Sequence, residues 1–75
     1  MRMERTPVSS TSLRSIGYDP DSSFLDVEFH SGAVYRYLGV PEREYEALLR
    51  DDSHGGYFNA NIRDRYPFIR LREPD

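Results

Sequence analysis

The stretch Phe24-Leu25-Asp26-Val27-Glu28-Phe29 decides the fold of this chain. Its apolar residues stand at every second position and alternate with two acids, which is the pattern of a strand with one buried and one solvated face. The sequence therefore predicts a β-strand over 24–29. This is the clearest secondary-structure signal in the chain, and the segments on both sides extend it into a sheet.

Two further strands are predicted on either side of this one. Leu13–Tyr18 precedes it, and Asp19–Ser22 lies between them as a turn, with a proline where turns favour it and an aspartate that can bond back to the chain. Ser31-Gly32 makes a tight connection to a third strand over Ala33–Val40. Together these segments predict a meander of three antiparallel strands.

The length of the connection at Ser31-Gly32 decides which side chains share a face. With a loop of two residues, Glu28 faces Tyr35 and Asp26 faces Tyr37, so both tyrosines lie on the outer face of the sheet. With a loop of three residues, both tyrosines turn inward. The two-residue loop is the expected arrangement.

The second half of the chain predicts one or two short helices and a final strand. Pro41 begins the first helix, and Gly55-Gly56 ends it. Tyr57–Arg63 is a short second helix or an irregular segment. Pro67 blocks its continuation, and Phe68–Leu71 forms a last short strand. The predicted fold class is α+β, an antiparallel β-meander of three strands followed by these helices and the C-terminal strand.

Composition excludes several kinds of site. The 75 residues contain no cysteine and no tryptophan, and all 10 basic residues are arginines. Without cysteine there is no disulfide framework and no thiolate metal site. Without lysine there is no Schiff base and no Walker-type phosphate loop. His30 and His54 lack the spacing of metal ligands. No catalytic, cofactor or metal residue is therefore predicted, and the chain is expected not to be an enzyme.

The length of the chain predicts one small domain. Residues 1–8 lack periodicity and are expected to form a flexible N-terminal arm, 9–72 the single domain and 73–75 a tail. No apolar run is long enough to span a membrane, and no signal-peptide core follows the N-terminus. A cytoplasmic location without a membrane partner is therefore expected.

The net charge of −3 argues mildly against nucleic-acid binding, because domains with that role are usually basic. The distribution of charge softens this argument. Acids dominate the centre of the chain, whereas arginines dominate both ends, and this pattern predicts a surface with regions of both signs.

Several short segments also follow one another in a characteristic order. They are Ser15–Pro20, Leu25–Phe29, Ser31-Gly32, Val34–Tyr37, Gly39–Pro41, Tyr57–Asn59, Ile62-Arg63 and Tyr66-Pro67. Together they resemble the KTSC domain family, from about Ser9 to Leu71. The family occurs at the C-terminus of some lysyl-tRNA synthetases and as small free-standing bacterial proteins. The resemblance implies a small bacterial domain without an established activity, for which RNA binding has been suggested.

Two groups of residues are candidates for contact with RNA or tRNA. Exposed tyrosines in Tyr35-Arg36-Tyr37 would stack unpaired bases, unless they pack beneath a helix or arm while the arginine pairs with an acid. The C-terminal arginines with their interleaved tyrosines would bind phosphates, unless they form a solvated face or pair with acids. The predicted binding residues are Tyr35, Arg36, Tyr37, Tyr57, Asn61, Arg63, Arg65, Tyr66, Arg70 and Arg72.

The function expected from the sequence is a small non-catalytic module that binds RNA or tRNA and needs no cofactor. The alternative is a module for protein interaction or self-association as a homodimer, using exposed tyrosines and a free sheet edge.

Overall fold

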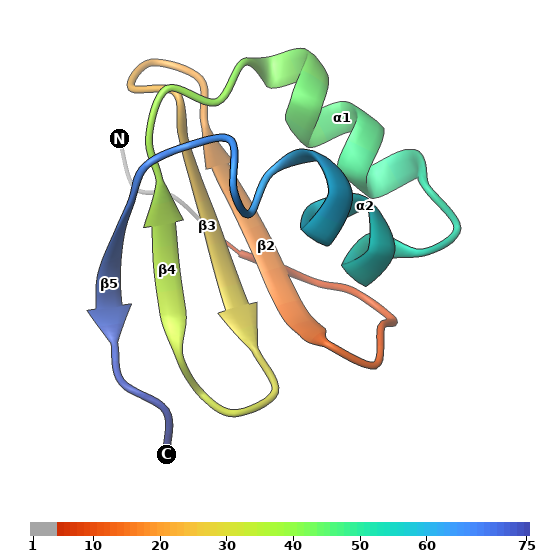
Figure 1. The fold of residues 1–75 in the computed structure, drawn as a ribbon, viewed down its shortest axis with the longest axis vertical. Coiled ribbons are helices and arrows are strands. Elements are labelled where there is room, and N and C mark those ends of the chain that lie inside the picture. The colour runs from red at the N-terminus through yellow and green to blue at the C-terminus, as the bar shows by residue number, and fades with distance from the viewer. Residues whose placement is uncertain (1–4) are drawn as a thin grey trace.

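Five strands and two helices make up residues 5–75, the part of the chain that the computed structural model describes. Their bounds are β1 Thr6–Pro7, β2 Leu13–Asp19, β3 Phe24–Phe29, β4 Val34–Tyr37, α1 Glu42–Arg50, α2 His54–Asn61 and β5 Phe68–Arg72. The strands form one antiparallel sheet in chain order. Both helices lie on one face of this sheet, next to β2 (Figure 1). The predicted α+β class is confirmed.

The meander has four strands rather than the predicted three, because β1 pairs with Ser15 and Ile16 of β2. Part of the expected N-terminal arm, Thr6–Pro7, thus belongs to the sheet, and Val8 packs against the core. Residues 1–4 of that arm lie outside the described residues. The flexibility of the arm and the boundaries 9–72 and 73–75 stay predictions.

The connection between β3 and β4 has three loop residues, so the predicted loop of two residues is wrong. Phe29 N donates to Ala33 O, and Gly32 N donates to Phe29 O, both at 2.9 Å. Gly32 has a φ of 96°, in the left-handed region that closes hairpins of this length. Glycine adopts this conformation readily because it lacks a Cβ atom.

The extra loop residue shifts the register by one and reverses the predicted faces of β4. Val27 lies opposite Tyr35, and Asp26 lies opposite Arg36. Tyr35 and Tyr37 therefore share the helix-bearing face with the apolar residues of β3. Tyr37 is only 2% exposed, which corrects the expectation that it lies on the outer face.

Charged side chains pair with one another on the outer face of the sheet, which is the face opposite the helices. Arg36 donates from Nε and Nη2 to the two carboxylate oxygens of Asp26, at 2.8 and 3.0 Å. Asp26 is 3% exposed, so this two-handed pair replaces the hydration that the carboxylate loses on burial. Arg36 therefore pairs with an acid, the alternative to a phosphate contact. The hydrogen bond to Asp26 raises the pKa of the Arg36 guanidinium.

The core lies between the helices and the central strands. Tyr18 of β2 stacks on Tyr45 of α1, with ring centroids 5.0 Å apart, and its hydroxyl donates to Val40 O at 2.5 Å. These contacts attach α1 to the sheet. The buried core residues are Leu13, Ile16, Leu25, Val27, Tyr37, Val40, Leu48, Phe58 and Ile62.

The boundary between the helices differs from the prediction. The first helix ends at Arg50, and Gly55-Gly56, expected to end it, lie in the first turn of α2. Ser53 caps α2 by accepting a hydrogen bond from Gly56 N at 3.1 Å. A Cβ atom at Gly55 would lie 3.2 Å from Ser12 Oγ, so glycine lets α2 approach the segment before β2 closely.

The third predicted strand is shorter than expected. It ends at Tyr37, because Gly39 with a φ of 70° turns the chain away from the sheet. Val40 N then donates to Ser23 O at 3.0 Å. This turn leads directly into Pro41 and α1.

Replacing Gly32 by alanine is expected to lower the free energy of unfolding by about 1–2 kcal/mol. Alanine disfavours the positive φ, and its Cβ atom would lie 2.5 Å from Asp75 Oδ2. Urea unfolding followed by circular dichroism measures this change. Gly39→Ala is the matched control, because its φ is also positive while no atom lies within 4 Å of the added Cβ; its loss should be smaller. Unchanged stability of Gly32→Ala would contradict the three-residue hairpin.

Candidate functional site

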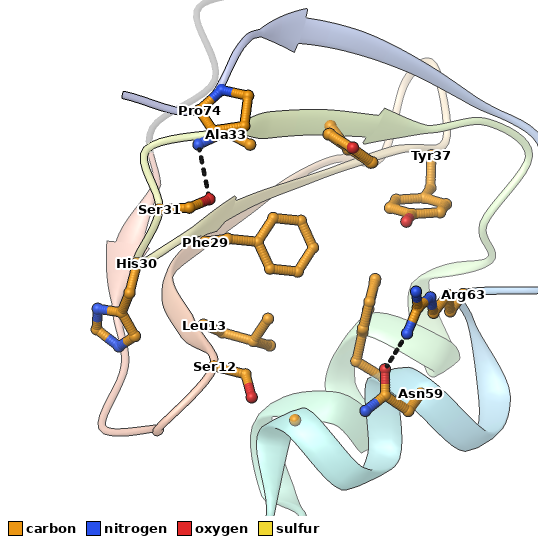
Figure 2. Close-up of a pocket in the computed structure, with 13 residues that line it drawn as sticks. Ser12, Leu13, Phe29, His30, Ser31, Ala33, Tyr37, Asn59, Arg63 and Pro74 are labelled. Atoms are coloured by element: carbon orange, nitrogen blue, oxygen red, sulfur yellow. Dashed lines mark hydrogen bonds between the residues drawn. The ribbon is translucent and has the colours of Figure 1, made fainter.

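An aromatic groove opens on the helix-bearing face of the sheet, between α2 and strands β3 and β4. Its volume is about 450 Å³, and Figure 2 shows Phe29 near its centre. Phe58 of α2 meets two rings of the sheet edge to face, at centroid distances of 5.6 Å to Phe29 and 5.4 Å to Tyr37. This geometry is favourable for aromatic pairs and gives the groove a well-packed aromatic wall.

Beside the groove, Tyr35, Phe68 and Arg70 form what we call the stacking platform. The rings of Tyr35 and Phe68 stack with centroids 4.9 Å apart and planes 6° from parallel. The Arg70 guanidinium lies 5.2 Å from the Tyr35 centroid, and its Nη2 donates to the Tyr35 hydroxyl at 3.0 Å. Phe68 is 50% exposed. The platform therefore exposes the apolar ring of Phe68 to solvent and holds the Arg70 guanidinium against Tyr35.

Polar groups line the opposite side of the groove. Arg63 Nη1 donates to Asn59 Oδ1 at 3.5 Å, and Figure 2 shows both residues on the helix side, with the Tyr37 ring facing them. Burial raises the pKa of Tyr37 to about 12, although Arg63 acts in the opposite direction. Tyr37 therefore stays a neutral hydroxyl at physiological pH. The groove thus joins an aromatic surface to Arg63, while Arg70 lies beside it against Tyr35.

Arg72 lies on the other face of the sheet from Arg70, whereas simple alternation placed them on one side. The ladder between β4 and β5 shifts register between Val34 and Tyr35. As a result Arg72 reaches the outer face, where Nη2 donates to Glu28 Oε2 and Nε donates to Gly32 O, both at 2.7 Å. Like Arg36, it belongs to the ionic contacts of the outer face and not to the groove.

Two other predicted binding residues connect the helical segments to one another, and a third bonds within α2. The hydroxyls of Tyr57 and Tyr66 both donate to the Glu44 carboxylate, the second at 3.0 Å. The bond to Glu44, together with burial, raises the pKa of Tyr57 to about 12. Asn61 Nδ2 donates to Tyr57 O at 3.2 Å. Arg65 is exposed after α2. Of the predicted residues, Tyr35, Tyr37 and Arg63 therefore line the groove, and Arg70 lies beside it against Tyr35.

The histidines make local structural contacts. His54 Nδ1 lies 2.8 Å from Leu48 O, and His30 Nε2 lies 2.8 Å from Ser10 O. Asp51 accepts from Ser53 N at 2.9 Å in the turn between the helices. Within residues 5–75, no group of three or more histidines and acids is placed to hold a metal ion.

Reasoning from the sequence missed Phe29, Phe58 and Phe68 as parts of the site. Phe29 and Phe58 lie within predicted elements, and their residue type does not distinguish a groove wall from an ordinary core. The sequence does contain a signal for Phe68. It stands two residues before Arg70 in a predicted strand, so both side chains lie on one face. Asn59, which is also absent from the predicted binding residues, lines the groove and contacts Arg63 there.

Comparison with known proteins identifies what this chain is similar to. A family model described as the KTSC domain matches residues 9–66. A crystal structure of a KTSC domain protein from Yersinia pestis superposes with a TM-score of 0.92 and 38% sequence identity, covering 95% of this chain and 100% of that one. An uncharacterized protein of Stutzerimonas stutzeri is 54% identical over 64 residues, which are 85% of this chain and 90% of that protein.

Longer relatives contain the same domain as a small part. A lysine–tRNA ligase of Nostoc punctiforme is 34% identical over 59 residues, which are 79% of this chain but only 10% of the ligase. Neither helix within residues 5–75 has the length and apolar character needed to cross a membrane. The expected cytoplasmic location stays a prediction.

Ionisation of Tyr37 is expected to make the protein less stable between pH 10 and 12. Its pKa rises from 10.0 to about 12 on folding, so the stabilisation is complete below pH 10 and is lost as the pH rises through the folded value. Tyr37→Phe should remove about 2 kcal/mol of this pH dependence. Urea unfolding of both proteins at a series of pH values measures this change in the free energy of unfolding. The difference between the parent protein and Tyr37→Phe at pH 8 controls for the effect of the substitution on packing. An equal pH dependence in both proteins would contradict a neutral buried hydroxyl.

Proposed function

The chain belongs to the KTSC domain family, and we propose that it is a non-catalytic module that binds unpaired RNA at the aromatic groove. The observation that carries this proposal is the exposed platform of Tyr35, Phe68 and Arg70 beside the groove. Proteins that bind single-stranded RNA stack bases on aromatic rings and hold the backbone with arginines.

The platform has the energetic qualities that stacking requires. Phe68 is held by the Tyr35 ring on one side and is half-exposed, so a base can extend the stack without unfolding any element. Each base stacked on an aromatic ring contributes about 1–3 kcal/mol. The stack is fixed by β4 and β5, so little conformational entropy is lost when a base binds.

Arg63 and Arg70 supply the cations for the phosphates. Arg70 pairs with Glu73 at 3.1 Å, and both side chains are strongly exposed, at 46% and 74%. Exposed ion pairs are weak, so a phosphate can replace the Glu73 carboxylate at little cost. Both arginines lie on the helix-bearing face, with Arg63 lining the groove and Arg70 beside it.

The names of some relatives support the proposal of an RNA ligand. Some of them carry the name lysine–tRNA ligase, and this domain covers 10% of their length. The histidines that a catalytic role would draw on are used in local contacts instead. We therefore assign the domain a binding role.

Arg70→Gln is expected to weaken the binding of a single-stranded oligonucleotide by about tenfold at low salt, because it removes a phosphate contact and a cation from the platform. Arg72→Gln is a matched control. It lies on the same strand and is similarly exposed but faces away from the groove, so it should change affinity by less than about twofold. Fluorescence anisotropy with labelled RNA measures both.

Stacking and charge are separated by a second pair of variants. Phe68→Ala should weaken binding at every salt concentration, whereas Arg70→Gln should flatten the dependence of affinity on salt. Ile69→Ala controls for a half-exposed apolar residue on the outer face of the same strand. Absence of binding by the parent protein at low salt, or equal effects of Arg70→Gln and Arg72→Gln, would contradict the proposal.

A second candidate function, self-association, rests on the exposed edge of the sheet. Three large apolar residues of β5, Phe68, Ile69 and Leu71, are 46–50% exposed. This strand pairs with β4 on one side and stands last in the sheet. A strand edge with this composition favours pairing with a further strand, for which a second copy of the chain is one source.

Self-association through β5 predicts a mass that rises with protein concentration in sedimentation equilibrium. Ile69→Ser should reduce that rise, because it removes apolar surface from the edge strand, while leaving RNA affinity unchanged. A monomer at all concentrations would rule out this candidate and leave RNA binding unaffected.

A further inference from the structure

The hydroxyl of Tyr37 is a polar group that the protein itself leaves without a partner. Tyr37 is 2% exposed and lines the groove, and within residues 5–75 its hydroxyl forms no hydrogen bond (Figure 2). No fully buried side-chain oxygen of these residues lacks a partner, so the small exposed part of Tyr37 includes its hydroxyl. This hydroxyl therefore opens to the groove, where an atom of a ligand can bond to it.

Two hydrogen-bond donors lie across the groove from this hydroxyl. Figure 2 shows Arg63 and Asn59 below the Tyr37 ring. Asn59 Oδ1 is engaged by Arg63 Nη1 at 3.5 Å, and a guanidinium has no acceptor atom, so this pair offers mainly donors to a ligand. Burial raises the pKa of Tyr37 to about 12, while the charge of Arg63 lowers it. The cation is therefore close enough to act on the hydroxyl.

The side chains that line the groove include no carboxylate. Among the described residues, 5–75, none of those that line it is an aspartate or a glutamate. Carboxylates are the side chains that typically accept from the amino group of a base. A base edge that enters between Tyr37 and Arg63 therefore meets donors, and it must supply acceptors to bond with them.

The groove also has the size and the neighbours that a single base requires. Its volume of about 450 Å³ lies in the lower part of the range of about 300–1,000 Å³ that is typical of sites for one small ligand. The Tyr37 ring lies with its centroid 5.5 Å from that of Phe68 and 6.4 Å from that of Tyr35. The groove therefore continues the aromatic surface of the stacking platform.

We propose that Tyr37, Arg63 and Asn59 select bases with a carbonyl oxygen where cytosine and adenine carry an amino group, namely uracil and guanine. This group lies on the edge of the base away from the ribose, which is the edge that leads when a base enters a groove. A carbonyl oxygen has two lone pairs and can accept from the Tyr37 hydroxyl and the Arg63 guanidinium together. An amino group there would bring its hydrogens toward a guanidinium that can only donate. This inference rests on the proposed function and deepens it by naming the bases that the groove takes.

The test compares a decamer of uridine with a decamer of cytidine at pH 8, where neither strand pairs with itself. The two strands share their backbone, their charge and the size of their bases, so contacts with phosphates cancel in the ratio of their affinities. The uridine strand should bind about tenfold more tightly, because its carbonyl oxygens match the donors of the groove. Fluorescence anisotropy of labelled strands at low salt measures this ratio.

Substitutions at the groove assign the preference to its side chains. Tyr37→Phe removes only the hydroxyl and keeps the ring, and it should lower the ratio of affinities to about threefold. Arg63→Gln introduces an acceptor beside its donors and should bring the ratio close to one. Tyr66→Phe is the matched control, because it removes a hydroxyl that donates to Glu44 outside the groove, and it should leave the ratio unchanged.

The outcomes separate this inference from the function on which it rests. If the cytidine strand binds as tightly as the uridine strand or more tightly, the inference is overturned while RNA binding stands. If neither strand binds at low salt, both the function and the inference fail. A preference for uridine that survives both Tyr37→Phe and Arg63→Gln would overturn the role assigned to these side chains.

Discussion

The backbone conformation of Gly32 is the constraint on which the functional surface depends. Because its φ is positive, the hairpin closes with three loop residues and not two. In a strand, a slip of one residue moves every side chain to the opposite face. The left-handed glycine therefore turns Tyr35 and Tyr37 to the helix-bearing face and places Arg36 opposite the buried carboxylate of Asp26. The groove therefore depends on the three-residue loop of this hairpin.

Much of the fold is readable in the sequence because its signals are local. The alternation in Phe24–Phe29 and the proline before Glu42 each report on their own neighbourhood, and the structure agrees with both. The faces of β4 were not readable, because loops of two and three residues both fit Ser31-Gly32. The position of Gly55 inside α2 could not be predicted for a similar reason. Its small size allows a close approach to Ser12, which is distant in the chain.

The candidate site was only partly readable for the same reason. Residue type predicts Tyr35, Tyr37, Arg63 and Arg70; the first three line one groove, and Arg70 lies beside it against Tyr35. Arg36 and Arg72 were singled out by the same criterion but pair with acids on the outer face. Residue type alone cannot distinguish these groups, because only the register and the shift between β4 and β5 decide which arginines face the groove.

The chain order of the strands has a consequence for how the domain assembles. Strands β2, β3 and β4 pair with neighbours in the chain, whereas β5 joins β4 only after both helices have intervened, with Arg70 opposite Tyr35. Closing so long a loop is entropically more demanding than closing a hairpin. We therefore expect β5 to dock last during folding. Since Phe68 and Arg70 belong to β5, the hydrophobic core can form before the binding surface is complete.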